Sequence, residues 1–404
     1  MKSPKPALTS KRFLLPFVLI TSLFFLWGFA RAILDVLNKH LQNDMNISIT
    51  QSALIQVTTY LGYFLMAIPA GLFINRRGYR YGVVLGLILF GVGALLFIPC
   101  AEAGTFYAFL LALFIIGCGL VFLETSANPY VTELGPADTA TSRLNLSQSF
   151  NGLGSLFATF VVGQYFFSGS DGGGSVVVPY TILGVIVLLI AIVFSRADLP
   201  EISHDDSGSE SGQGSYARLF HRPLFLFGLL ALLAYEVSEI SINSYFINFV
   251  TGEGWMDDRL ASVFITGALA VFMVGRFLGS WIMRTVKAER MLAICATGSV
   301  VCIVLVLLNI GVVSMVALTL NYLFEAIMFP TIFALALRGL GSLTKSASSL
   351  LMMTPIGGCG FLLMGYLADH CSDLVLPFFI PLAGYIVVLA FALRLLRQKN
   401  PETN

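Results

Sequence analysis

The feature that most constrains the fold of this chain is a succession of apolar runs, each about as long as a membrane is thick. About 20 consecutive apolar residues in a helix cross the hydrocarbon core of a bilayer. The 404-residue chain is 57% hydrophobic and only 11% charged, whereas about a quarter of the residues in a soluble domain are charged. The sequence therefore predicts an all-α polytopic membrane protein with twelve transmembrane helices, at about 13–38, 52–75, 80–100, 104–131, 142–168, 178–196, 222–250, 259–284, 289–308, 311–338, 346–369 and 374–397.

Charge, cysteine content and missing motifs argue against several other classes of protein. The formal net charge of +1 gives no indication of a nucleic-acid partner. The six cysteines include no C-x-x-C pair, so neither a disulfide framework nor a metal site is expected. The sequence has no Walker loop and no cluster of catalytic side chains. We therefore expect no enzymatic activity, no cofactor, and an energy source other than ATP.

A polar segment divides the apolar runs into six and six. Residues 202–215 are rich in Ser, Gly, Asp and Glu, a composition too poor in apolar residues to fold alone and typical of a flexible linker. We expect an N-terminal six-helix half at 1–196, a cytoplasmic linker at 197–221 and a C-terminal six-helix half at 222–404. Nothing in the sequence requires an assembly larger than a monomer.

The positive charges predict the orientation in the membrane. With the N-terminus inside, nineteen Lys and Arg residues fall in cytoplasmic segments, whereas only Lys39 and Arg259 fall outside. Lys and Arg concentrate in the cytoplasmic loops of membrane proteins. Both termini are therefore expected in the cytoplasm, with the chain in a cytoplasmic (inner) bacterial membrane.

A weak internal repeat supports two related halves. Glu124 and Pro129 form E-x4-P in the fourth predicted span, and Glu325 and Pro330 form the same pattern 201 positions later. The same offset carries Asp35 to Glu236. Parallel halves of this kind are typical of transporters whose substrate site lies between the repeats near the bilayer midplane.

Glu124 is the first candidate for a functional role, because an ionisable residue within a span is rare and marks a pathway or site by default. Asn128 lies at i+4, so its amide can share a helix face with the Glu124 carboxyl. Pro129 removes a backbone hydrogen bond beside both and can kink the helix. A carboxyl group satisfied by a neighbouring helix, with no role in transport, is the alternative.

Arg31 and Asp35 also lie within a predicted span, at positions i and i+4. They can form an ion pair, which would make Asp35 a structural carboxylate. Alternatively Asp35 faces the cavity, where it can bind and release a proton, or it lies in a solvated position near the cavity mouth, since it belongs to the outer third of its span.

Three further carboxyl groups, Glu236, Glu239 and Glu325, lie in spans of the C-terminal half. They can face the cavity, cap helix packing or pair with Arg276, which we interpret as structural. On the cytoplasmic side, Arg76 and Arg77 follow the second span, as a gate element or as topology determinants.

The fifth predicted span opens with a stack of amides. Asn145, Gln148 and Asn151 lie three residues apart, on one helix face, where amides can hydrogen-bond the hydroxyls of a polyol. Gly152 and Gly154 would also permit close approach of a neighbouring helix, which explains the glycines but not the amides.

Several longer motifs resemble the fucose:H+ symporter family of the major facilitator superfamily, which includes L-fucose permease and glucose/galactose porters. They are FFLWG at 24–28, DVLNKH at 35–40, LETSANPY at 123–130, RLNLSQSFNG at 143–152 and IMFPTIF at 327–333. The resemblance implies that Asp35 and Glu124 serve in proton coupling and sugar binding, and that Gln148 and Asn151 lie near the sugar. We add Asn38, Asn128 and Glu239 to the expected substrate-binding residues.

The chain also departs from the family pattern. Arg31 occupies a position expected to be uncharged, Glu236 is additional, and Glu325 replaces an expected small polar residue. Arg31, Glu236 and Glu325 are therefore expected to have gating or auxiliary roles, as are Arg76 and Arg77.

Together these features predict secondary active uptake of a monosaccharide, such as L-fucose, galactose, glucose or a related hexose, by proton symport with alternating access. Three alternatives stay open: sodium in place of the proton, proton-linked export of small organic compounds, and a membrane sensor that retains a transporter fold.

Overall fold

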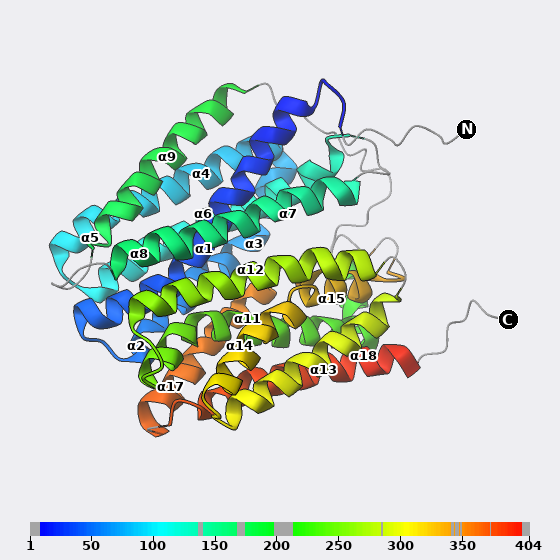
Figure 1. Cartoon of the computed structure of the whole chain (residues 1–404). Helices are drawn as coiled ribbons and strands as arrows, with labels where there is room; N and C mark the ends of the chain where they lie inside the picture. The colour runs from blue at the N-terminus through cyan, green and yellow to red at the C-terminus, as the bar shows by residue number, and fades with distance from the viewer. Residues whose placement is uncertain are drawn as a thin grey trace. The chain divides into compact units, whose positions relative to one another are not determined.

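The computed structural model describes residues 9–135, 140–167, 174–197, 213–283, 286–340, 343, 347, 350–371 and 373–397. Within these ranges the regular structure is helical (Figure 1). Ten helical stretches are long and apolar enough to cross a membrane, which suits an environment where every backbone polar group must be satisfied within the segment.

The other two predicted spans, the fifth and the eleventh, are less regular. The fifth consists of α7 (Ala140–Phe157), a π-helical turn (Ala158–Val162) and α8 (Gly163–Phe166), which follow one another directly. The eleventh, described in part, contains a 3-10 helix (Thr354–Gly360) followed by α17 (Phe361–Cys371). The amides of the fifth and the glycines of the eleventh explain why neither resembles an ordinary apolar helix.

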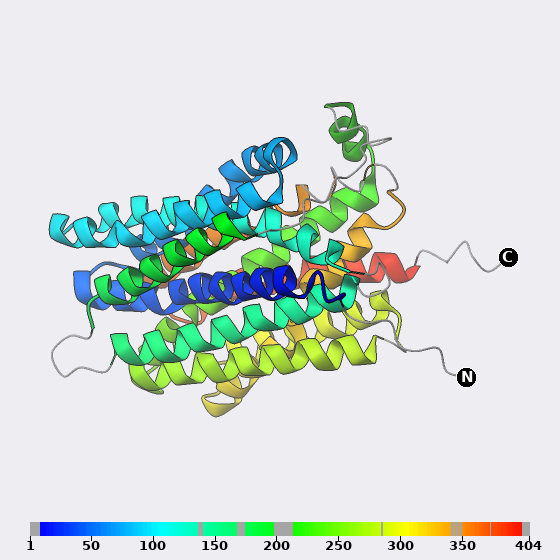
Figure 2. The same cartoon turned by 90° about the horizontal axis from the view of Figure 1, so that it is seen from above.

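The chain forms two compact units, Met1–Met45 with Thr58–Asp205, and Asn46–Val57 with Asp206–Asn404. The helices within each unit lie side by side (Figures 1 and 2). The remaining helices that lie wholly in the first unit are α1 (Leu14–Met45), α4 (Tyr79–Leu95), α5 (Phe97–Ala103), α6 (Phe106–Glu133) and α9 (Val177–Arg196), and most of α3 (Leu54–Arg77) belongs to it as well.

Small residues bring α1 and α7 into close contact in the first unit. A Cβ atom added to Gly28 would lie 2.0 Å from the backbone oxygen of Asn151, and one added to Gly154 would lie 2.0 Å from that of Phe25. About one turn earlier in each helix, the hydroxyls of Thr21 and Ser147 share a hydrogen bond of 2.8 Å. The predicted role of Gly154 in close helix approach is therefore confirmed.

The second unit surrounds α11 (Pro223–Gly252), against which α12, α15, α17 and α18 pack. Its other helices are α2 (Ile49–Ser52), α10 (Gln213–Phe220), α12 (Asp258–Ile282), α13 (Ala288–Leu307), α14 (Val312–Glu325), α15 (Met328–Leu337), a 3-10 turn (Leu376–Phe378) and α18 (Phe379–Arg397). The described end of the predicted linker thus contains α10. The division at 196 and 222 otherwise stays a prediction.

Residues 46–57 join the second unit through specific hydrogen bonds. The carboxylate of Asp369 in α17 accepts hydrogen bonds from the backbone N–H groups of Ile49 and Thr50, at 3.2 and 2.8 Å, and from the Thr50 hydroxyl. The Gln56 amide donates to the hydroxyl of Ser244 in α11 at 2.8 Å. Helix α2 is thereby fixed to α17, and the first residues of α3 are fixed to α11.

Candidate functional site

Glu124 lies within α6 beside a cation and two tyrosines of the first unit. The Arg31 guanidinium of α1 interacts electrostatically with the Glu124 carboxyl, and its Nε donates to the Tyr60 hydroxyl of α3 at 3.2 Å. Tyr63, one turn after Tyr60, is buried and lies within the electrostatic reach of both Glu124 and Arg31. Helices α1 and α3 therefore hold Arg31 and Tyr60 in contact, with the Glu124 carboxyl of α6 within electrostatic reach.

The side chain of Asn128 extends this group along α6. It is half-buried, and its Oδ1 is enclosed without a hydrogen-bond partner in the described part of the chain. A buried polar atom normally has a partner, so this oxygen is suited to accept a hydrogen bond from a ligand. The helix itself continues through Pro129 to Glu133, so Pro129 does not interrupt it.

The other candidates on α1 occupy different environments. Asp35 is half-buried and Asn38 is fully buried. Arg31 donates a hydrogen bond to Tyr60 and interacts electrostatically with the α6 carboxyl. An ion pair between Arg31 and Asp35 stays a prediction, as does a cavity position for Asp35.

The two amides of the fifth span differ in what they contact. Asn151 donates through Nδ2 to the backbone oxygen of Phe24 at 3.3 Å, so its amide serves at least in part to hold α7 against α1. Gln148, one turn earlier, is half-buried. A position of the Gln148 amide beside the sugar stays a prediction. The side chain of Asn145 lies outside the described residues.

The second unit contains its own cluster of carboxyl groups, centred on the buried phenol of Tyr235. Glu236, Glu239, Glu325 and Arg276 all act on this phenol electrostatically. Glu236 and Glu325 are buried, whereas Glu239 is half-buried and accepts a hydrogen bond from Asn243 at 3.1 Å. The three carboxyl groups that the sequence singled out separately therefore lie near one another.

Three tyrosines near these carboxyl groups were missed by sequence reasoning: Tyr60 and Tyr63 of the first unit, and Tyr385, whose hydroxyl donates to Glu325. They look like ordinary aromatic residues in a chain with 14 Tyr and 34 Phe. The useful signal would have been that a buried phenol needs a hydrogen-bond partner, so that a Tyr in a span near a carboxyl group is a candidate contact.

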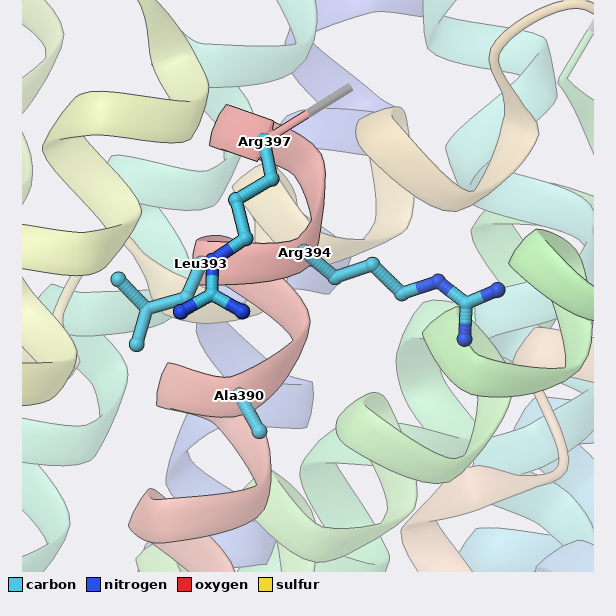
Figure 3. A pocket seen from close by; sticks show the side chains of 4 residues that line it. All are labelled: Ala390, Leu393, Arg394 and Arg397. Atoms are coloured by element: carbon cyan, nitrogen blue, oxygen red, sulfur yellow. The ribbon is translucent and has the colours of Figure 1, made fainter.

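Two other features lie apart from these clusters. Arg76 and Arg77 are exposed in the last turn of α3, which fits either predicted role. A cavity of about 470 Å³ lies along the end of α18, lined by Ala390, Leu393, Arg394 and Arg397. Figure 3 shows the two arginines pointing in different directions from the helix, and none of the candidate site residues lines it.

Residues 20–358 match the model of the Major Facilitator Superfamily. The chain is 34% identical to the L-fucose-proton symporter of Escherichia coli, with 96% of this chain and 94% of that protein covered. It is 35% identical to the glucose/galactose transporter of Brucella abortus, with 93% and 92% covered.

Solved structures agree with these sequence comparisons. The crystal structure of the Escherichia coli fucose:proton symporter is similar with a TM-score of 0.73 at 33% identity, over 95% of this chain and 98% of that one. A D-xylose-proton symporter is similar with a TM-score of 0.74 at 14% identity, which bears on the fold alone.

Proposed function

We propose that this chain, which belongs to the major facilitator superfamily, imports a monosaccharide together with a proton. It is an integral membrane transporter and not an enzyme. We place it in the cytoplasmic membrane of a bacterium as a monomer with both termini inside, and we expect it to work by alternating access between two halves. Relatives that carry L-fucose, glucose and galactose support a hexose or a deoxyhexose as the substrate.

The observation that supports proton coupling is the electrostatic interaction of Arg31 with Glu124. A carboxyl group surrounded by protein can be neutralised by a proton or by a nearby cation. In the protonated state Glu124 is neutral and Arg31 retains its hydrogen bond to Tyr60. After the proton leaves, the guanidinium stabilises the carboxylate. Glu124 can therefore release its proton with a cation available to stabilise the carboxylate, and Asp35 is the second group that we propose for proton coupling.

We assign sugar recognition to polar groups that can accept or donate hydrogen bonds. The Asn128 Oδ1 can accept a hydrogen bond from a ligand, and we propose the half-buried Gln148 as the second amide. Amides suit hydroxyl groups because they carry both donors and acceptors. Asp35, Asn38, Glu124, Glu239 and Asn151 complete the proposed binding set. Arg31, Arg76, Arg77, Glu236 and Glu325 keep the auxiliary or gating roles expected of them.

The test is the external pH of weakly buffered, de-energised cells that express the protein, recorded without sodium. L-Fucose, galactose, glucose and N-acetylglucosamine are added in turn. A rise in external pH after one sugar, absent from cells without the protein, supports inward proton symport and identifies the substrate.

Other outcomes would overturn the proposal in specific ways. Labelled uptake without a pH change in sodium-free medium would remove proton coupling, and uptake that requires sodium would replace it. A third outcome concerns cells that are loaded with substrate. Alkalinisation of the medium that depends on this substrate would indicate a proton-linked exporter, whereas acidification is expected of a symporter that runs in reverse.

A further inference from the structure

The tenth predicted span, 311–338, is discontinuous after Glu325. Helix α14 ends at Glu325 and α15 begins at Met328 (Figure 1). Pro330 has no N–H to donate to the carbonyl oxygen of Ala326, and its ring clashes with that carbonyl in a regular helix. Irregular backbone at membrane depth is tolerated only where protein or a cavity surrounds it.

Two side chains from other helices satisfy carbonyl oxygens at this break. The Arg276 Nε of α12 donates to the backbone oxygen of Ala326 at 3.3 Å. The Tyr235 hydroxyl of α11 donates to the backbone oxygen of Glu325 at 3.2 Å. The break is therefore a supported feature of the fold, and it places the Glu325 carboxyl at its edge.

That carboxyl group is completely buried in a network of neutral partners. Its Oε2 accepts hydrogen bonds from the Tyr385 hydroxyl at 2.5 Å and from the Asn321 Nδ2 at 2.9 Å. Asn321 Nδ2 also lies 3.1 Å from the Tyr385 oxygen. The second oxygen, Oε1, is enclosed without a partner in the described part of the chain.

The surroundings of Glu325 disfavour a negative charge. Tyr385 of α18, Tyr235 of α11 and Cys302 of α13 face it as neutral groups, and Glu239 of α11 faces it as a like charge. Arg276 of α12 contacts the adjacent carbonyl oxygen. Among the described residues no cation forms an ion pair with this carboxyl, so an ionised Glu325 would be buried and unpaired, which is strongly unfavourable.

We propose that Glu325 is a second proton-binding site of this chain, formed with Asn321 and Tyr385 at the break between α14 and α15. The carboxyl group binds one proton when it is enclosed as in this structure. When the break rearranges and opens the group to water, the O–H bond breaks, the proton passes to the solvent and a carboxylate remains. Since Glu124 carries one proton in the first unit, the two units together carry two protons in each cycle. This inference rests on the proposed function.

Two details favour a proton over a sodium ion at this position. A sodium ion needs several oxygen ligands at once, whereas a proton needs one atom. Oε2 already accepts two hydrogen bonds, and the unpartnered oxygens of the immediate network are Glu325 Oε1 and Asn321 Oδ1.

The first test does not depend on any substrate. Infrared spectra of the purified full chain in lipid are recorded during a pH titration, because a protonated carboxyl group has a resolved C=O stretching band. In wild type a band that titrates with pH should be lost in Glu325→Gln. Tyr385→Phe, which removes the hydroxyl donor, should shift the frequency of the same band. Glu289→Gln is the matched control, since Glu289 is ion-paired with Arg338 and its change should leave the band intact.

The second test measures coupling. Proteoliposomes containing wild type or Glu325→Gln are given opposed sugar and pH gradients, with the sugar that raises external pH in the cell assay, and the gradient ratio at zero net flux gives the stoichiometry. We expect about two protons per sugar in wild type and about one in Glu325→Gln.

Distinct results would overturn the inference. A carboxyl band that is unchanged in Glu325→Gln, or one that does not respond to pH, contradicts a titrating Glu325, as does an unchanged stoichiometry. If Glu325→Gln does not fold, an unshifted band in Tyr385→Phe has the same meaning. If no sugar moves protons in wild type, the proposed function fails, whereas the infrared result still decides whether Glu325 titrates.

Discussion

The two carboxyl groups Glu124 and Glu325 lie in different electrostatic surroundings. Glu124 has Arg31 as its electrostatic partner, whereas Glu325 has neutral donors. Two carboxyl groups at equivalent positions of a sequence repeat thus have different partners, and we expect different substitutions to reveal them.

Replacing Glu124 by Gln should abolish accumulation of sugar against a gradient while counterflow exchange continues. The amide keeps the size and much of the hydrogen bonding of the carboxyl but cannot release a proton. Concentrative uptake of labelled sugar should fall at least about tenfold, equivalent to ~1.4 kcal/mol, with exchange less affected. Normal concentrative uptake by this variant would remove Glu124 from proton coupling.

Replacing Arg31 by Gln should slow transport because the Glu124 carboxylate loses its cation. If Arg31 acts through Glu124, adding Arg31→Gln to Glu124→Gln should produce little further loss, since residues that share one interaction are non-additive in a double-mutant cycle. Initial uptake and exchange rates of the four proteins give the coupling. Fully additive effects on exchange would separate Arg31 from Glu124.

The sequence alone was sufficient to name Arg31, Asp35 and Glu124 as candidates, because charges within apolar runs are conspicuous. It was insufficient to identify their partners. Tyr60 and Tyr63 come from another helix, and the contacts of a phenol depend on how helices pack, which no local pattern records.

At the scale of helices, close packing depends on a few glycines. Gly154→Ala should prevent the approach of α7 to α1, because the new methyl group would meet the backbone oxygen of Phe25 at 2.0 Å. Overpacking of this kind destabilises by about 1–3 kcal/mol. The thermal unfolding temperature in detergent should fall clearly.

Gly71→Ala is the matched control for this change. Gly71 also lies within a helix, α3, but an added Cβ atom would meet nothing within 4 Å. The unfolding temperature of Gly71→Ala should equal that of wild type or rise slightly, because Ala is the better helix former. An equal effect of the two substitutions would contradict a specific α1–α7 contact.

The break between α14 and α15 should depend on the hydroxyl of Tyr235. Tyr235→Phe keeps the ring and removes the donor to the Glu325 carbonyl, which should destabilise the protein by about 1 kcal/mol. Thermal unfolding measures the change, with Tyr366→Phe as a control because Tyr366 is exposed. Identical unfolding of Tyr235→Phe and wild type would mean that this hydrogen bond does not support the break.

The same E-x4-P pattern gives a continuous helix in α6 and a break after α14. A proline predicts only that a carbonyl loses its backbone donor. Whether the helix then separates depends on donors from elsewhere, here Arg276 and Tyr235. The sequence therefore predicted where distortion was possible and left open which helix would show it.

At the scale of the whole molecule, apolar run length and long motifs predicted the class of protein and its family correctly. The all-α fold and the major facilitator family are confirmed. The assignment of residues 46–57 to the second compact unit was not predictable, because it depends on Asp369 and Ser244, which are far away in the sequence. The boundaries of the halves stay predictions.

The most direct test of proton-driven sugar import uses purified protein in proteoliposomes with an acidic exterior and no sodium. Labelled sugar, chosen from the four of the cell assay, should accumulate inside above its external concentration and leave again when a protonophore collapses the gradient. Entry that stops at equal concentrations, or accumulation that appears only with a sodium gradient, would contradict proton symport.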